Sequence, residues 1–327
     1  MNRFVKGCNV LVTGGAGFIG SNLVESLLGN GNKVTCLDNF STGKRENIEG
    51  FLSNPGFNLI EGDIRNYSDC EKSVQGIDFV FHQAALGSVP RSIKDPVSAT
   101  DVNIGGFVKM LYASKEARVK RFIYAASSST YGDHPDLPKV EERIGKPMSP
   151  YGITKYVDEL FAENFASTYK IEVIGLRYFN VFGRRQDPFG AYAAVIPLFV
   201  KKLLGHESPV INGDGLYSRD FTYIDNVLQA NHLAALTEDK SAINQVYNVA
   251  HGERTNLNEL FEMIKQLTGK SDNIILGIKP SYGPEREGDI PHSQASIEKA
   301  QRLLGYKPTH SVREGMEEAI EWYRHNL

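Results

Sequence analysis

The chain has 327 residues, of which 41% are hydrophobic and 23% charged, and its formal net charge at pH 7 is -3. The length allows one large domain or two, and the composition is that of an ordinary globular enzyme. The small net charge gives no reason to expect a nucleic acid or a membrane as partner, no apolar run reaches the length of a membrane span, and the three cysteines lack metal-ligand spacing. We therefore expect a cytoplasmic protein without a metal site.

The first predicted unit is a strand, a tight turn and a helix near the N-terminus. The apolar run 10–12 is followed by small residues at 14–17, and apolar residues then recur at helical spacing from Ile19. Gly14 permits the sharp turn, Gly17 leaves room for a pyrophosphate at the helix N-terminus, and Gly20 lets the helix pack closely on the strand. The unit predicts a dinucleotide site that includes Gly14, Gly17, Phe18, Ile19 and Gly20.

A second predicted strand, over 33–37, ends in Asp38. A carboxylate at this position can accept hydrogen bonds from a ribose 2′-hydroxyl and would repel a 2′-phosphate, so it favours NAD over NADP as cofactor. The polar loop that follows would lie beside the same ribose, and the residues after a third predicted strand, over 58–61, would flank the adenine. These positions are Asn39, Ser41, Thr42 and Gly43 in the loop, and Asp63 and Ile64 after the third strand.

Strands and helices continue to alternate up to residue 180. Helices are predicted over 67–74, 99–117 and 150–169, and strands over 78–82, 121–126 and 172–177. This alternation predicts an α/β protein with a doubly wound parallel sheet of the Rossmann type, whose ligands bind at the carboxyl ends of the strands.

The alternation breaks after residue 180. Helices are predicted over 193–204, 224–236, 296–304 and 312–323 and from Asn256 onward, where Glu259 would complete a capping box; short strands are predicted over 210–215, 219–223 and 246–249. We expect an NAD-binding domain over 1–180, to which segments near 224–250 return, and a smaller, interleaved substrate domain mainly over 181–327.

The residues suited to chemistry follow the predicted strand 121–126 and open the helix 150–169. A hydroxyl-rich run covers 127–131, and Tyr151 and Lys155 lie one turn apart on one helix face. A free tyrosine, with a pKa of about 10, is a poor base at neutral pH, but an adjacent ammonium and a bound nicotinamide cation favour its phenolate. We expect Tyr151 to be a base that Lys155 activates, and a serine hydroxyl to orient a substrate alcohol.

Several of these motifs together resemble the extended short-chain dehydrogenase/reductase family over essentially the whole chain. They are the run 13–20, the serine run before Tyr131, and Tyr151 with Lys155. Longer runs at 82–92, 178–188 and 190–197 are similar to its bacterial UDP-N-acetylhexosamine 4-epimerases and their uronic acid relatives.

The resemblance implies a UDP-sugar substrate and tightly bound NAD. The reaction would be C4 epimerisation of UDP-GlcNAc to UDP-GalNAc through a 4-keto intermediate, for polysaccharide biosynthesis. The resemblance also implies a homodimer formed through the long helices around 100–117 and 150–169.

The resemblance also implies roles for individual residues. Ser127 would be the catalytic hydroxyl, with Tyr151 and Lys155. Gln83, Ala84, Ala85, Tyr178 and Val181 would contact the cofactor, together with Tyr151 and Lys155. Ser88, Ser128, Ser129 and Gln186 would line the sugar pocket, Asn180 would touch the diphosphate, Ala194 and Val195 would meet the uracil, Arg219 and Arg286 would clamp the phosphates, and Asp289 would accept from the uridine ribose.

Ser293 bears on the identity of the sugar. In the epimerases that the chain resembles, the matching position walls the C2 side of the hexose, and the resemblance implies that a small residue there leaves room for an acetamido group. Two further substrates stay open, UDP-glucose and the uronic acid form (UDP-GlcNAcA to UDP-GalNAcA). Arg91, Arg184 and Arg185 are possible partners of a C6 carboxylate, but the sequence does not determine where they point.

Other functions of the family are less well matched. A nucleotide-sugar dehydratase would need an acid and a base beside its catalytic hydroxyl, where this chain has Ser128 and Ser129, and a decarboxylase would also need an acidic residue there. An inactive NAD-binding regulator would have no need of Ser127, Tyr151 and Lys155 together.

Overall fold

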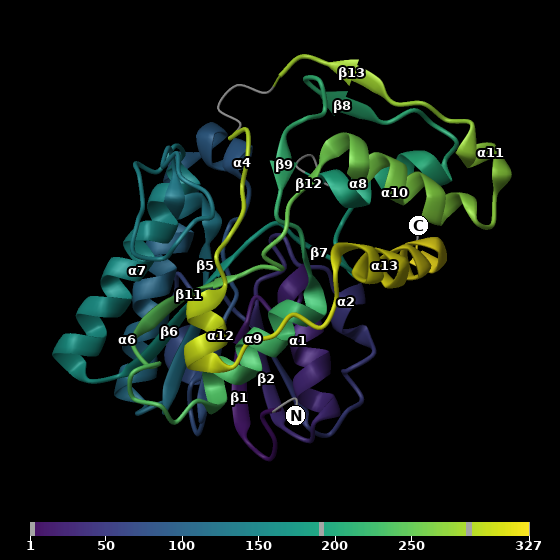
Figure 1. The fold of residues 1–327 in the computed structure, drawn as a ribbon. Helices are drawn as coiled ribbons and strands as arrows, with labels where there is room; N and C mark the ends of the chain where they lie inside the picture. Colours follow the sequence, from purple (N-terminus) through teal and green to yellow (C-terminus); the bar gives the residue numbers. More distant parts are fainter. Residues whose placement is uncertain (1–3, 190–192, 286–289, 327) are drawn as a thin grey trace.

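The computed structural model describes residues 4–189, 193–285 and 290–326 (Figure 1). Its centre is a seven-stranded sheet of order β11-β6-β5-β4-β1-β2-β3, in which every neighbouring pair is parallel. The strands are β1 Asn9–Thr13, β2 Lys33–Asp38, β3 Phe57–Glu61, β4 Phe79–His82, β5 Arg121–Ser127, β6 Glu172–Tyr178 and β11 Gln245–Val249. The predicted α/β class with a doubly wound parallel sheet is confirmed.

Helices cover both faces of this sheet because its strands carry apolar side chains on both sides. One core cluster joins the sheet to α1 (Phe18–Gly29), α9 (Ile224–Leu236) and α12 (Glu298–Leu304). A second cluster joins the other face to α3 (Tyr67–Ser73), α6 (Phe107–Glu116) and α7 (Pro150–Tyr169). Figure 1 shows the two groups on either side of the strands.

The helix predicted over 99–117 is three consecutive segments. A short helix, α5 (Pro96–Thr100), passes into a π-helical stretch, Asp101–Gly106, which continues as α6. Within the π-helical stretch the buried Asn103 side chain accepts from the Leu86 N–H at 2.7 Å and donates to the Thr154 hydroxyl at 3.1 Å. Such widened turns often occur at functional sites, and here the turn secures the chain after β4.

The second lobe is built from short strands and helices above the carboxyl ends of the main sheet (Figure 1). Its two-stranded sheets pair β7 (Val181–Phe182) with β10 (Thr222–Tyr223), β9 (Ser218–Arg219) with β12 (Thr255–Asn256), and β8 (Val210–Asn212) with β13 (Ser281–Gly283). Its helices are α8 (Val195–Leu204), α10 (Leu257–Gly269), α11 (Asn273–Leu276) and α13 (Val312–Asn326). Two short helices, α2 (Glu46–Glu49) and α4 (Val89–Lys94), lie in loops of the first lobe.

The strand predicted over 219–223 is wrong as a single element. The chain leaves β9 at Asp220, whose buried carboxylate accepts from the backbone N–H groups of His251, Gly252 and Ala295, and it enters another sheet at Thr222. The capping box of α10 is confirmed: the Asn256 side chain accepts from the Glu259 N–H, and the Glu259 carboxylate accepts from the Asn256 N–H. Among the described residues, no helix combines the length and apolar character required to span a bilayer.

Candidate active site

A cavity of about 600 Å³ runs along the carboxyl ends of β1 to β6 and under the loop after β7. Most of the predicted cofactor residues line it: Gly14, Gly17, Phe18, Ile19, Gly20, Asp38, Asn39, Ser41, Thr42, Asp63, Ile64, Gln83, Ala84, Ala85, Tyr151, Lys155, Tyr178 and Val181. Ser88, Ser127, Gln186 and Ala194, predicted for the substrate, line the same cavity. One continuous space therefore joins the predicted nucleotide and sugar positions.

The turn after β1 has the shape of a dinucleotide cradle. Gly14 has φ +68, a conformation that favours glycine, and a Cβ there would lie 2.8 Å from the Ala84 backbone. A Cβ on Gly20 would collide with the Gly14 carbonyl, so the helix approaches the turn closely only because residue 20 is glycine. The first turn of α1 opens on the cavity, where its N–H groups and dipole favour a phosphate.

Asp38 is held at the end of β2 by the backbone of this turn. Its carboxylate accepts from the N–H of Ala16 at 2.9 Å and from that of Phe40 at 2.8 Å. Burial nevertheless raises the pKa of the carboxyl above its usual value. Each oxygen has a further lone pair and the residue lines the cavity, so it can accept hydrogen bonds from ribose hydroxyls. The glycine cradle and Asp38 together fit NAD.

The three predicted catalytic side chains reach the cavity from two elements. Ser127 ends β5, and its Oγ accepts from the Ser129 N–H at 3.1 Å. Tyr151 is at the start of α7, where the Ser149 hydroxyl caps the helix and the Ser92 hydroxyl accepts from the Tyr151 N–H at 3.0 Å. These contacts set the helix start so that the tyrosine opens on the cavity.

Lys155 follows one turn later and is buried. Its ammonium donates to the Ala125 carbonyl and to the Asp158 carboxylate, each at 3.1 Å. Burial opposes the charge of Lys155, but the adjacent Asp158 carboxylate outweighs this effect, and the pKa of the ammonium lies above its usual value. The lysine is therefore a fixed cation beside Tyr151 at neutral pH.

Several predicted residues lie elsewhere. Gly43, Ser128, Ser129, Asn180, Val195, Arg219 and Ser293 do not line the cavity, and Arg286 and Asp289 lie outside the described residues. Arg219 donates to the carbonyls of Ser218 and Pro291, and the Ser293 N–H donates to the same Ser218 carbonyl. Arg219 and Ser293 therefore lie close together in the second lobe, away from the cavity wall.

Sequence reasoning did not assign some lining residues to the site. They are Leu37, Gly62, Leu86, Gly87, Val102, Ala125, Ala126, Asp187 and Ala193. Leu37, Ala125 and Ala126 are at strand ends, where the rule for parallel sheets could have found them. Val102 comes from the π-helical stretch, for which the sequence carries no evident signal.

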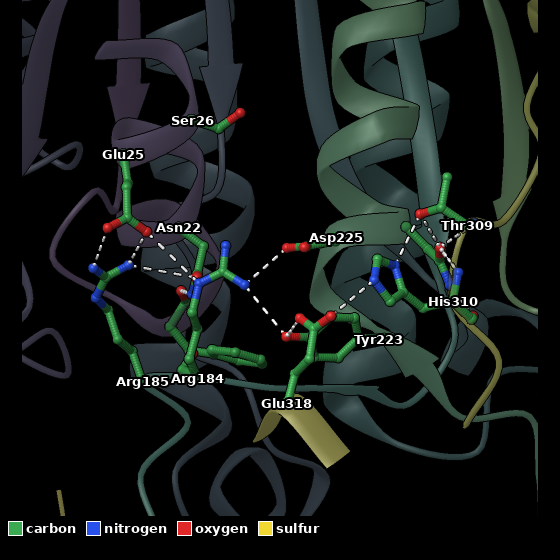
Figure 2. Close-up of polar contacts among 12 residues, drawn as sticks. Asn22, Glu25, Ser26, Arg184, Arg185, Tyr223, Asp225, Thr309, His310 and Glu318 are labelled. Carbon is green, nitrogen blue, oxygen red and sulfur yellow. Dashed lines mark hydrogen bonds and ion pairs between the residues drawn. The ribbon is translucent and has the colours of Figure 1, made fainter. Parts of the chain in front are cut away.

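Arg184 and Arg185 do not line the cavity, and Figure 2 shows their guanidinium groups in contact with acidic side chains. Arg185 makes a two-pronged contact with Glu25 of α1, at 2.9 Å to each oxygen, and Arg184 pairs with Asp225 of α9 at 2.9 Å. These pairs fix the loop that carries the lining residues Gln186 and Asp187. Of the three arginines considered for a carboxylate, Arg91 is the one that lines the cavity.

The same network continues to the C-terminal helix (Figure 2). The Tyr223 hydroxyl donates to Glu318 at 2.9 Å, and His310 lies 3.1 Å from the other oxygen of Glu318. Asp225, His310 and Glu318 are close enough to resemble a metal-ligand set. Arg184 already forms an ion pair with Asp225. We therefore interpret the cluster as a set of polar contacts that joins the two lobes, and not as a metal site.

Comparison with known proteins agrees with this geometry. Residues 10–250 match the NAD dependent epimerase/dehydratase family. A putative UDP-glucose 4-epimerase of Methanocaldococcus jannaschii is 37% identical over 97% of this chain and 99% of its own length.

Two solved structures are similar over nearly their full length. A UDP-N-acetylglucosamine 4-epimerase of Methanobrevibacter ruminantium, in complex with UDP-N-acetylmuramic acid, is 40% identical with a TM-score of 0.90, covering 99% of this chain and 100% of its own. A UDP-glucose 4-epimerase of Thermotoga maritima with UDP-glucose is 38% identical with a TM-score of 0.89, covering 97% and 99%. These likenesses support an NAD-dependent enzyme of the nucleotide-sugar 4-epimerase type, and the chain belongs to the NAD dependent epimerase/dehydratase family.

Proposed function

We propose that this enzyme interconverts UDP-GlcNAc and UDP-GalNAc at C4. The observation that carries the proposal is the single cavity in which the glycine cradle and Asp38 meet Ser127, Tyr151 and Lys155. The small Ser293 and the similarity to a UDP-N-acetylglucosamine 4-epimerase support an acetylated sugar. Such a reaction would supply an activated sugar for polysaccharide synthesis, and we expect it to take place in the cytoplasm, where UDP-sugars and NAD are available.

The chain's own residues would carry the proton and hold the substrate. Tyr151 would take the proton of the C4 hydroxyl, directly or through Ser127, and Lys155 would stabilise the phenolate by its charge. NAD, when bound, supplies a hydride acceptor at C4 that later returns the hydride. Tyr151 would give the proton back after the sugar has presented its other face, so no net oxidation occurs.

The second lobe would hold the nucleotide while the sugar turns. We propose Arg219 and Arg286 as ligands of the two phosphates, since guanidinium groups match phosphate oxygens in planar, charge-assisted pairs. Ser128 and Ser129 would line the sugar pocket, and Asn180 would contact the sugar diphosphate. Ala194 and Val195 would meet the uracil, and Asp289 would accept from the uridine ribose. Arg219 does not line the cavity, so its contact with a phosphate requires its side chain or the second lobe to move when substrate binds.

UDP-glucose is a second candidate substrate. It is favoured by the UDP-glucose 4-epimerases to which the chain is similar. The uronic acid form has less support, because Arg184 and Arg185 are already paired with Asp225 and Glu25. Arg91 stays the candidate partner of a C6 carboxylate.

We also propose a homodimer formed through α6 and α7. Large apolar side chains are exposed on these neighbouring helices: Tyr112 on α6, and Ile153, Leu160 and Phe161 on one face of α7. Ile153 is 50% exposed and Leu160 47%. Exposure of these apolar side chains to water is unfavourable in a monomer, and a partner surface would bury them. Light scattering should give twice the chain mass for the wild type and a monomer for Leu160→Glu.

Turnover of UDP-GlcNAc, its uronate, UDP-glucose and UDP-glucuronate, without added cofactor, tests the proposal. Chromatography of the products should show the C4 epimer of UDP-GlcNAc formed faster than that of UDP-glucose. Faster turnover of UDP-glucose would transfer the assignment to the second candidate. If none of the four sugars is epimerised by protein that holds NAD, the proposed reaction is wrong although the cofactor site is correct.

A further inference from the structure

A buried carboxylate lies beside Lys155, and the mechanism above makes no use of it. Asp158 follows Lys155 by three residues on α7, and its Oδ2 lies 3.1 Å from the lysine Nζ. Lys155 is 3% exposed and Asp158 0%. Isolated charges are very unfavourable in such an environment, so each is stable there only beside the other.

The contacts of Lys155 orient its ammonium group. An ammonium has three N–H donors. One donates to the carbonyl of Ala125 and one to Asp158, each at 3.1 Å, and the residue lines the cavity beside Ala125. No third acceptor contacts Nζ among the described residues, so the third donor can meet a group bound in the cavity.

The neighbouring charged and titratable groups do not replace Asp158. Those that face the pair are Tyr151 and Glu159 on α7, Tyr124 on β5 and His82 on β4. Glu159 is already held by both prongs of Arg177 on β6, at 2.9 and 2.7 Å. Burial lowers the pKa of His82 to about 3 and raises that of Tyr124 well above its usual value, so both are neutral.

The buried position of Asp158 is also unfavourable for the stability of the fold. Its Oδ1 is buried and has no hydrogen-bond partner among the described residues. Burial opposes the charge of Asp158 and raises the pKa of the carboxyl above its usual value. An unsatisfied buried acceptor destabilises a fold, so fold stability alone does not account for this residue. Violations of this kind concentrate at functional sites.

We propose that Asp158 is a positioning residue for Lys155, which orients the ammonium toward the cofactor cavity and keeps it charged so that Tyr151 can ionise. This inference rests on the proposed roles of Tyr151 and Lys155. A variant without the carboxylate lacks the negative charge beside Tyr151 and Lys155. These two side chains, which titrate together, then lose their first proton at lower pH. Part of that proton loss then comes from the buried lysine, which removes the cation on which the role of Tyr151 as a base depends.

Three variants separate the effect of Asp158 on the orientation of Lys155 from the effect of its charge and from its effect on fold stability. Asp158→Asn keeps an oxygen that can accept from Lys155 but removes the charge, and Asp158→Ala removes both. Glu163→Gln makes the same loss of charge at an exposed position of α7 and is the matched control. In the pH profile of kcat, the rising limb of both Asp158 variants should move about one unit lower. The plateau should fall about fivefold for Asp158→Asn and about fiftyfold for Asp158→Ala.

Cofactor affinity gives a readout independent of turnover. Titration of stripped protein with NADH, followed by nicotinamide fluorescence, should show about tenfold weaker binding for Asp158→Ala, less for Asp158→Asn and no change for Glu163→Gln. A fall in melting temperature with an unchanged pH profile and unchanged NADH affinity would reduce Asp158 to a structural residue and overturn the inference.

Tyr151→Phe distinguishes this inference from the proposed function. If that variant keeps wild-type activity, the proposed chemistry is wrong. If it is inactive while both Asp158 variants match the wild type, only the role of Asp158 is wrong.

Discussion

The cofactor half and the sugar half of the candidate site are built differently. In the cofactor half, Gly14, Asp38, Gln83 and Ser127 stand at or directly after the ends of adjacent parallel strands, so the main sheet places them. In the sugar half, the candidate residues come from loops, short strands and helix starts that are far apart in the sequence. From this difference we expect that substitutions in the sugar half can change substrate choice without disturbing the cofactor.

Asp220 shows how the sugar half is assembled. Its carboxylate accepts from the N–H groups of His251, Gly252 and Ala295, and its carbonyl accepts from the Asn180 amide. Asp220 therefore joins these segments, through its carbonyl to Asn180 and through its buried carboxylate to the segment that leads to Ser293. A substitution in these segments is expected to alter one sugar more than another, whereas a change in the cofactor half should affect all sugars equally.

Among the substitutions that test this comparison, Tyr151→Phe should cause the largest loss of activity. Loss of a general base costs about 10³-fold in kcat, and the loss should be the same for every sugar because the base acts at C4 of each. NAD content after purification, measured by absorbance, should stay at the wild-type level. A loss confined to one sugar would contradict the assignment of Tyr151 to shared chemistry.

Gly20→Ala should abolish cofactor retention. The added Cβ would collide with the Gly14 carbonyl and displace the turn, which should weaken NAD binding by about 2–3 kcal/mol, or about 100-fold. Gly29→Ala is the matched control on the same helix, since a Cβ there meets nothing within 4 Å. Calorimetric titration of stripped protein with NAD checks both. Equal affinities would mean that the turn does not hold the cofactor.

Asp38→Asn should weaken NAD binding by about tenfold, because hydrogen bonds to a charged group contribute about 1.5–3 kcal/mol and the amide retains part of them. Affinity for NADP should rise relative to NAD, since the carboxylate no longer repels a 2′-phosphate. Titration of the stripped variant with each cofactor measures the ratio. An unchanged ratio would remove Asp38 from cofactor choice.

Ser293→Tyr should have the smallest effect of these substitutions. It should change the turnover of the sugars without changing cofactor binding, which distinguishes the two halves of the site. We expect about a tenfold loss of kcat/KM for UDP-GlcNAc and a much smaller loss for UDP-glucose, since differences of steric fit are worth about 1–3 kcal/mol. NAD content should not change. Equal losses on both sugars would refute a role for Ser293 at the acetamido group.

The cofactor half was largely predictable from the sequence. The strand, glycine turn and helix at the N-terminus, the carboxylate ending β2 and the membership of the epimerase/dehydratase family are all confirmed. Expectations for the sugar half are weaker, since Asn180, Arg219 and Ser293 do not line the cavity. No local period or turn rule relates these loops to one another, because only long-range contacts such as those of Asp220 bring them together.

The sequence by itself determined the alternation of strands and helices, the glycine cradle and the order of the catalytic residues, because backbone preferences and side-chain periodicity act over a few residues. Only the tertiary structure decided that Arg184 and Arg185 form ion pairs with Asp225 and Glu25, and that Asp158 is buried in contact with Lys155. The direction and charge of these side chains depend on burial and on partners that the packing of the other elements supplies.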